Sequence, residues 1–227
     1  MMNFACVCYG TKYPVEYVQK LYNMVQRNTT IEHKFYVFTD HVKMQKMVEG
    51  DLHVHKFPRD DIEGWWNKLQ LFHPDTPLEG TTLYMDLDVV ITQNIDCFFT
   101  YKPEMMFVGM NDFNPTTKQW NSSIFKFNKE FNISGELWHP WINDRASLTR
   151  RFAGDQNYIS DKIKGKPGCE SYPDSWTQSY KWYDRTGSRY SKQDMTYEHN
   201  GESLVTVFHG QPNPHESDKD WIKNAWK

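Results

Sequence analysis

The sequence predicts an α/β fold with a largely parallel central sheet flanked by helices. Short apolar, β-branched runs typical of buried strands alternate with segments in which apolar residues recur at helical spacing. The 227 residues are enough for one large domain, and the sequence contains neither an internal repeat nor a low-complexity linker. We therefore expect a single domain, 1–227, whose strands are joined by crossovers on both faces of the sheet.

The first hundred residues show this alternation most regularly. "FACVCY" predicts a buried strand that ends at Gly10, and Pro14 can begin a helix that runs to about Arg27. "KFYVFTD", ending at Asp40, and "LHVHKF" predict two further strands around a short helix. "GWWNKLQLF" predicts a compact helix entered through Gly64, and "TTLYMDLDVVI" predicts one strand over residues 81–91.

The second half of the chain is less regular. Apolar runs predict strands at residues 104–110, 122–128 and 203–210, and residues 130–164 have mostly helical spacing. A polar helix is expected at the end, in "WIKNAWK", whereas residues 165–203 follow neither pattern.

Composition limits the kind of partner. The formal net charge is −3, so the chain lacks the basic field expected of a protein that binds nucleic acid or an anionic membrane. Aromatic residues make up 16% of the chain and include nine Trp. Sugar-binding sites and protein interfaces both use such rings, and composition alone does not choose between them.

The cysteines and the N-terminus predict a cytoplasmic protein. Cys6, Cys8, Cys97 and Cys169 follow no zinc-binding spacing, and we expect them to be reduced. Cys6 and Cys8 lie two apart in an apolar strand, the usual place of a small buried thiol. The N-terminus does not look like a signal peptide, and no apolar run approaches the ~20 residues of a membrane span.

Polar residues gather where predicted strands end. Asp40, Asp86, Asp88 and His209 all fall at such positions, and ligands of parallel sheets bind at the carboxyl ends of the strands. Residues two apart in a strand point to the same side, so Asp86 and Asp88 can converge. Two close carboxylates either share a proton or bracket a cation. A divalent ion with oxygen ligands is the simpler solution, and an imidazole from His209 would favour Mn²⁺ over Mg²⁺.

The spacing of the two aspartates is weak evidence by itself. Asp218 and Asp220 repeat it on what looks like a solvated helix, and only the preceding apolar strand distinguishes Asp86 and Asp88. A strand-end Asp that caps a turn is the alternative for the pair. A hydrogen-bonded structural histidine is the alternative for His209.

Four segments of the chain resemble one family of enzymes. They are "GWWNKLQLF" (64–72), "LYMDLDVVI" (83–91), "GDQ" (154–156) and "FHGQPNPHE" (208–216), in this order. Together they are similar to nucleotide-sugar-dependent glycosyltransferases with the GT-A fold, in particular the branch with glycogenin and bacterial lipopolysaccharide galactosyltransferases and its bacterial and viral relatives. The resemblance spans nearly the whole chain. It implies a GT-A-like, Rossmann-like mixed sheet with a nucleotide-binding half (1–100) and a donor-sugar and acceptor half (101–227).

The resemblance also implies roles for individual residues. Asp86, Asp88 and His209 would hold Mn²⁺ (or Mg²⁺), which would bind both phosphates of the donor and stabilise the leaving diphosphate. Lys68 would act near the phosphate and the donor sugar; without the resemblance it would be taken for a surface lysine. The residues implied to bind the nucleotide are Cys8, Tyr9, Gly10, Thr11, Asp40, Lys68, Asp86, Leu87, Gly210 and His215.

A second group is implied to contact the sugars. Asp155 and Gln156 resemble a catalytic pair near the anomeric carbon of the donor, and Asn121 and Ser122 resemble a step that faces the donor sugar and the acceptor. The local alternative for Asp155 is an N-cap, since it directly precedes a helical pattern. Several aromatic residues are candidates for stacking on an acceptor, although core or rim positions suit them as well: Trp138, Trp141, Trp176, Tyr180 and Trp182.

One departure from the family concerns the diphosphate. The resemblance implies a basic residue in the turn after the histidine, where this chain has Gln211 and Asn213. A neutral amide does not replace a full charge beside a diphosphate. Either Lys12 or His215 compensates, or the affinity for the nucleotide is reduced.

The sequence therefore predicts a metal-dependent glycosyltransferase (a hexosyltransferase) that moves a sugar from a nucleoside-diphosphate donor, UDP-linked, to a hydroxyl acceptor on a glycan. Retention is implied by the glycogenin branch, whereas inversion would follow if Asp155 were a general base. One alternative is a glycan- or nucleotide-binding protein on the same fold without turnover. The other is a haloacid-dehalogenase-type phosphatase, which "YMDLDVV" fits, although its nucleophile strand normally comes first in the domain.

Overall fold

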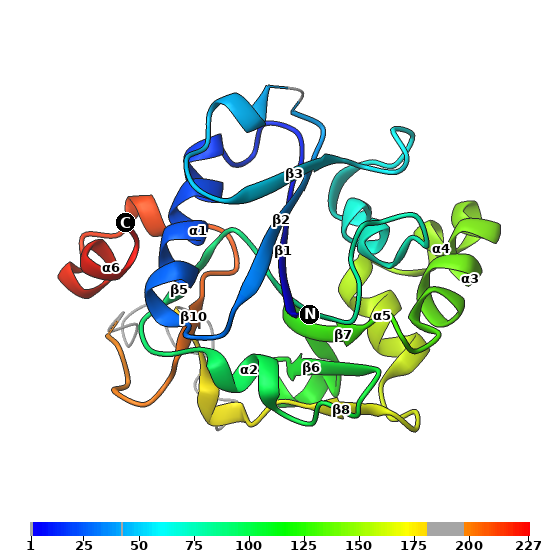
Figure 1. Ribbon diagram of the computed structural model, residues 1–227. Coiled ribbons are helices and arrows are strands. Elements are labelled where there is room, and N and C mark those ends of the chain that lie inside the picture. Colours follow the sequence, from blue (N-terminus) through cyan, green and yellow to red (C-terminus); the bar gives the residue numbers. More distant parts are fainter. Residues whose placement is uncertain (1, 42, 181–197) are drawn as a thin grey trace.

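The computed structural model describes residues 2–41, 43–180 and 198–227. Trp182 lies outside these residues. The chain forms a seven-stranded sheet, a smaller three-stranded sheet and helices on both faces of the larger sheet (Figure 1).

The larger sheet has the strand order β3-β2-β1-β4-β7-β6-β8. Its strands are β1 (Met2–Cys8), β2 (His33–Thr39), β3 (Leu52–Lys56), β4 (Thr81–Met85), β6 (Phe107–Asn111), β7 (Trp120–Asn128) and β8 (Cys169–Ser171). All neighbouring pairs are parallel except those that β7 makes with β4 and β6, so β7 alone runs against the others. The prediction of a mixed, mostly parallel sheet is confirmed.

Helices cover both faces of this sheet, as expected from the alternation of elements. The α-helices are α1 (Val15–Asn28), α2 (Asp96–Thr100), α3 (His139–Asn143), α4 (Arg145–Arg151), α5 (Asp155–Ile163) and α6 (Asp220–Ala225). The 3₁₀ segments are η1 (Met44–Lys46), η2 (Gly64–Phe72), η3 (Pro115–Thr117), η5 (Asp174–Trp176) and η6 (Pro214–Glu216), and η4 (Ser134–Trp138) is a π-helical turn.

Alternation along β1 divides the core into two layers. Phe4, Cys6 and Cys8 pack against the apolar side of α1, whereas Ala5 and Val7 pack against the layer that contains η2 and the helices α3 to α5. Figure 1 shows α1 and α6 on one side of β1 and β2 and the helices α3 to α5 on the other. Cys6 and Cys8 are buried, as predicted.

The predicted single strand over residues 81–91 is wrong in one respect that concerns the site. It divides into β4 and β5 (Val89–Ile91), with a turn at residues 86–88 between them. β5 leaves the large sheet and pairs antiparallel with β10 (Val205–Val207), which also pairs with β9 (Thr177–Ser179). The two aspartates therefore lie at a junction between two sheets and not along one continuous strand.

In the described part of the chain no helix is both long and apolar enough to cross a membrane.

Candidate active site

A cavity of about 340 Å³ opens beyond the carboxyl ends of β1 and β4. It is lined by residues from six regions: the loop after β1, helix η2, the turn at 86–88, the start of β7, the start of α5 and the segment after β10. Its lining includes Tyr9, Lys12, Tyr13, Trp65, Lys68, Tyr84, Asp86, Leu87, Asp88, Asn121, Ser122, Gly154, Asp155, Gln156 and His209. The structure thus brings together most of the residues that the sequence singled out.

Backbone hydrogen bonds fix the aspartate turn. The amide of Asp86 donates to the carbonyl of Ser123 in β7 (2.9 Å), so the turn stays attached to the large sheet. The amide of Phe208 donates to the carbonyl of Asp88 (3.3 Å), which brings the following residue, His209, to the same cavity. Two segments more than a hundred residues apart therefore meet at the turn.

Lys68 lies at the centre of the polar groups in the cavity. Only 7% of this residue is exposed. Its ammonium group lies 2.9 Å from a carboxylate oxygen of Asp86 and 3.3 Å from one of Asp155. It also donates to the carbonyl and the hydroxyl of Ser122 (3.0 and 3.1 Å). Burial alone would lower the pKa of Lys68, but the charges of Asp155 and Asp86 outweigh it and raise this pKa.

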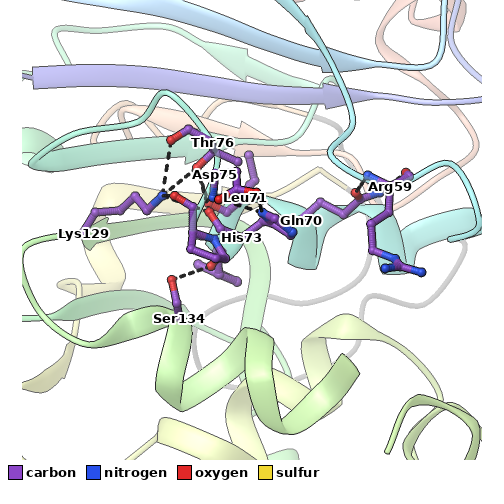
Figure 2. A network of polar contacts seen from close by, with 10 residues as sticks. Arg59, Gln70, Leu71, His73, Asp75, Thr76, Lys129 and Ser134 are labelled. Carbon is purple, nitrogen blue, oxygen red and sulfur yellow. Dashed lines mark hydrogen bonds and ion pairs between the residues drawn. The ribbon is translucent and has the colours of Figure 1, made fainter. Parts of the chain in front are cut away.

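A polar network holds the end of the helix that carries Lys68 (Figure 2). The hydroxyl of Ser134 donates to the carbonyl of Phe72 (2.7 Å), and Lys129 donates to the carbonyl of His73 (2.9 Å) and the hydroxyl of Thr76 (2.8 Å). Gln70, within the helix, exchanges two hydrogen bonds with the backbone of Arg59 (2.8 and 3.1 Å). These contacts satisfy backbone groups at the helix end and so fix the position of η2.

Asp86 is paired within the protein. Besides Lys68, its carboxylate accepts a hydrogen bond of 2.5 Å from the hydroxyl of Tyr84. Burial would raise the pKa of Asp86, but Lys68 and these hydrogen bonds lower it.

Asp88 is in a less favourable electrostatic position. It is only 7% exposed and accepts a hydrogen bond from the hydroxyl of Tyr13 (2.7 Å). Burial and the negative charge of Asp86 raise the pKa of Asp88 above that of an ordinary aspartate. The turn therefore holds one carboxylate that has a cationic partner and a second that lacks sufficient positive charge.

The residue types of the predicted metal ligands suit a divalent cation, but their side chains are not grouped as a complete coordination site. Three carboxylates line the cavity (Asp86, Asp88 and Asp155) against two ammonium groups (Lys12 and Lys68). Carboxylate oxygens and an imidazole form a donor set for Mn²⁺ or Mg²⁺. Within the described residues, however, no three His, Cys, Asp or Glu side chains are grouped so as to hold a metal ion. In Asp86 the contacts with Lys68 and Tyr84 both use Oδ1, and in Asp88 the hydrogen bond from Tyr13 uses Oδ2, so each carboxylate has a second oxygen that these contacts do not use.

The residues expected to contact the sugars lie beside Lys68. Asp155 is the first residue of α5 and is 5% exposed. The N-cap alternative for this residue is wrong, because Gly154 occupies that position and the carboxylate of Asp155 pairs with Lys68. Gln156 donates to Asp112 (2.9 Å) and accepts from the amide of Ser122 (3.3 Å), so it joins α5 to the start of β7.

Asn121 has a local role as well as facing the cavity. Its side-chain oxygen accepts a hydrogen bond from the amide of Ser123 (2.9 Å). This hydrogen bond uses only the side-chain oxygen, so the side-chain nitrogen of Asn121 remains available to donate to other partners in the same cavity.

The predicted nucleotide-binding residues divide between two places. Tyr9, Leu87, Asp86 and Lys68 line the acidic cavity. Asp40 lines a second cavity with Lys56 and Arg59, beyond the ends of β2 and β3, and both of its carboxylate oxygens accept from the amide of Gly10 (3.0 and 3.1 Å). Gly10 adopts a φ of 58°, a left-handed conformation that glycine adopts readily.

Four other predicted nucleotide-binding residues do not line either cavity. Thr11 is exposed in the loop after β1, and Gly210 follows His209 with a φ of 82°. Cys8 is buried, and burial raises the pKa of its thiol to about 12. The ring of His215 contacts the hydroxyl of Tyr17 (2.5 Å) instead of the cavity.

These positions bear on the missing basic residue. Asn213 begins the η6 turn, where its amide group and backbone bind Glu216, and Gln211 is exposed. Neither lines the acidic cavity, whereas Lys12 does. Of the two cations considered from the sequence, Lys12 is therefore the one at the site.

Three aromatic residues of the cavity were not singled out from the sequence: Tyr13, Tyr84 and Trp65. A signal for Tyr84 existed, since it lies two residues before Asp86 in the strand that the sequence predicted, and such residues point to the same side. No local pattern indicated Tyr13, which reaches Asp88 across 75 positions of sequence. The aromatic residues that were singled out instead are mostly core: Trp138, Trp141 and Tyr180 are buried, and Trp176 packs on Phe98.

The sheet order and the position of the cavity define the class of fold. The chain has the GT-A-like fold of nucleotide-sugar glycosyltransferases, as the resemblance of the four segments implied. This finding also argues against the phosphatase alternative.

Particular solved structures support this assignment. The galactosyltransferase LgtC, in complex with donor and acceptor sugar analogs, is similar over 99% of this chain and 91% of its own, with a TM-score of 0.64 and 14% identity. The glycosyltransferase GlyE of Streptococcus pneumoniae TIGR4 has a TM-score of 0.68 and 18% identity, and 99% of this chain matches 63% of that one. The bifunctional glycosyltransferase WbbM has a TM-score of 0.62 and 9% identity, and 99% of this chain matches 51% of that one. No family model and no curated protein matches the sequence.

Proposed function

We propose that the protein is a metal-dependent hexosyltransferase that moves a sugar from a nucleoside-diphosphate donor, UDP-linked, to a hydroxyl of a glycan. The observation that carries the proposal is the cavity at the strand ends, where the Asp86–Asp88 turn faces Lys68, Asp155 and Gln156. The similarity to LgtC, whose structure holds donor and acceptor sugar analogs, supports the same two-substrate arrangement here.

Asp86, Asp88 and His209 would hold Mn²⁺ or Mg²⁺. When bound, the ion supplies positive charge to the diphosphate and so stabilises it as a leaving group. The raised pKa of Asp88 supports this assignment, because an added cation would compensate a carboxylate that burial and Asp86 now disfavour.

The remaining residues of the cavity bind and orient the donor. The ammonium of Lys68 pairs with Asp86 and Asp155, and it would also contact a phosphate of the bound donor. Lys12, exposed at the edge of the cavity, would supply the phosphate contact that Gln211 and Asn213 do not provide. Asp155, Gln156, Asn121 and Ser122 would accept and donate hydrogen bonds to the hydroxyls of the donor sugar.

In the transfer, the oxygen of the acceptor hydroxyl bonds to the anomeric carbon of the donor. The bond from that carbon to the phosphate oxygen breaks, and its electron pair leaves with the nucleoside diphosphate. The acceptor proton passes to a phosphate oxygen of the leaving group or to water. A buried, polar cavity lowers the barrier because its charges are fixed before the reaction begins.

The same proposal includes a cellular location and a role for each half of the chain. Four free cysteines in the structure suit a cytoplasmic protein. Residues 1–100 would bind the nucleotide, and residues 101–227 would bind the donor sugar and the acceptor.

A thermal-shift experiment tests the proposal. UDP should stabilise the protein only in the presence of Mn²⁺, by about 5–10 °C at a hundredfold excess over its Kd. Asp88→Ala should abolish this shift, whereas Asp218→Ala, in the exposed pair with the same spacing, should retain it. If Asp88→Ala binds UDP as well as the wild type does, the metal assignment is wrong.

A second assay separates the transferase from a protein that binds without turnover. The neutral Gln211 and Asn213 are the observation that favours the second possibility. A transferase should release UDP slowly from a UDP-hexose in the presence of Mn²⁺, even with water as the acceptor. Binding of UDP with no release from any UDP-hexose would favour the binding protein.

A further inference from the structure

Trp65 is the one large, exposed apolar side chain of the described residues that lines the acidic cavity. It is 53% exposed; the other two such residues, Met47 and Phe131, lie elsewhere on the surface. Single exposed apolar residues are common on protein surfaces, but this does not explain why an indole lines a polar cavity.

The helix explains how Trp65 comes to face the cavity. Residues three apart in a 3₁₀ helix lie on the same side, so Trp65 lies above Lys68, about 6 Å nearer the entry of η2. The neighbouring Trp66 supplies the packing, because its ring stacks on the buried Trp141 with centroids 5.7 Å apart. Trp65 is therefore not needed to anchor the helix.

One edge of the indole lies close to the segment that carries the proposed sugar-binding pair. A Cβ placed on Gly154 would lie 3.2 Å from Nε1 of Trp65 and 3.4 Å from its Cδ1. The ring thus lies against the backbone directly before Asp155 and Gln156. Since the residue as a whole stays more than half exposed, much of the ring surface remains open at the mouth of the cavity.

Trp65 and the Lys68–Asp155 pair lie at different depths in the cavity, so the two positions suit different ligands. Lys68 and Asp155 are buried at the inner end, where a charged and hydroxyl-rich donor suits them. Trp65 lies further out on the same side and carries no charge, so its face does not suit a phosphate. A flat aromatic surface does suit the C–H face of a pyranose ring, which packs on it while the ring hydroxyls stay free for hydrogen bonds.

We propose that Trp65 is the acceptor platform, on which a neutral hexopyranose at the end of a glycan stacks with one hydroxyl directed toward Asp155 and Gln156. This inference rests on the proposed transferase function. It adds an acceptor class, a neutral hexopyranoside, and a residue that selects it.

The test compares transfer with hydrolysis in the same enzyme. Release of UDP from UDP-hexoses is measured with Mn²⁺, with and without p-nitrophenyl hexopyranosides of galactose, glucose and N-acetylglucosamine. For Trp65→Ala, the ratio of acceptor-dependent to acceptor-independent release should fall at least tenfold at low acceptor concentration. Trp65→Phe should recover at least a third of the ratio, and Phe131→Ala, which removes an exposed ring away from the cavity, should leave it unchanged.

Two results overturn the proposal. An unchanged ratio in Trp65→Ala, including an equal loss of both reactions, means that Trp65 does not serve the acceptor. Donor hydrolysis by the wild type without stimulation by any of the hexopyranosides means that the acceptor class is wrong. The absence of Mn²⁺-dependent UDP binding in the wild type would instead remove the proposed function itself, and the thermal shift with UDP detects this separately.

Discussion

Replacing Lys68 with Met removes the cation that pairs with a buried carboxylate, Asp155, and a partly buried one, Asp86. The substitution keeps most of the side-chain volume but leaves Asp86 and Asp155 without the ammonium that lies 2.9 and 3.3 Å from them. Breaking a buried ion pair by removing one partner lowers the free energy of unfolding by about 3–5 kcal/mol. For a chain of this size we expect the Tm of the metal-free protein to fall by about 6–20 °C.

Added Mn²⁺ should recover part of this loss. A divalent ion bound by Asp86 and Asp88 would replace some of the missing positive charge, whereas Asp155 would remain uncompensated. Differential scanning calorimetry with and without Mn²⁺ measures both effects. The double variant Lys68→Met/Asp155→Asn should be more stable than Lys68→Met, since it removes one of the stranded charges.

Lys129→Met is the matched control. This lysine is partly buried, and its ammonium donates to the carbonyls of His73 and Pro74 and to Thr76, with no carboxylate among these partners (Figure 2). Its loss should lower the free energy of unfolding by about 1–2 kcal/mol, with no dependence on Mn²⁺. Equal destabilisation of the two variants, or equal recovery by Mn²⁺, would refute the view that Lys68 and the metal compensate the same charge.

Three further predictions concern phosphate binding and stability. Lys12→Ala should weaken Mn²⁺-dependent UDP binding about three- to tenfold in calorimetric titration and leave uridine binding unchanged, whereas the exposed control Lys34→Ala should alter neither. Lys126→Met should lower the free energy of unfolding by about 1–3 kcal/mol in urea, because the buried ammonium binds three carbonyls at and after the end of α2; an unchanged midpoint would contradict this. Burial would raise the pKa of Asp96, but hydrogen bonds from Thr29, Thr30 and Asn94 outweigh it and lower this pKa below its value in the unfolded chain. The contribution of ionised Asp96 to the free energy of unfolding is therefore complete above about pH 4 and is lost progressively at lower pH. Asp96→Asn should therefore be less stable than the wild type at pH 7, and the difference should shrink steadily as the pH falls below about 4; a constant difference would count against this reasoning.

The sequence predicted the larger sheet well because its signal is local. The strands β1, β2 and β3 are short apolar runs, each bounded by a helix or a turn, and their parallel pairing follows from the crossovers. The break of residues 81–91 into β4 and β5 was not predictable in the same way. Val89, Val90 and Ile91 are as apolar as the residues before them, and they leave the sheet because β10, more than a hundred residues away, pairs with them.

The site shows the same limit. The aspartate turn, Lys68 and the Asp155–Gln156 pair were recognised because each lies in a segment that resembles glycosyltransferases. Their mutual arrangement depends on tertiary contacts: Lys68 meets Asp155 across 87 positions, and Tyr13 meets Asp88 across 75. Trp65 was missed because an indole next to a second indole gives no sign of which one is buried, and only the packing of Trp66 on Trp141 decides it.

A crystal structure of the protein with Mn²⁺ and UDP tests the central claim most directly. We expect an anomalous peak for one Mn²⁺ within about 2.5 Å of a carboxylate oxygen of Asp86 and of Asp88 and of a ring nitrogen of His209, in contact with both phosphates. A metal ion bound away from this turn, or UDP bound in this cavity with no metal ion at Asp86 and Asp88, would contradict the account.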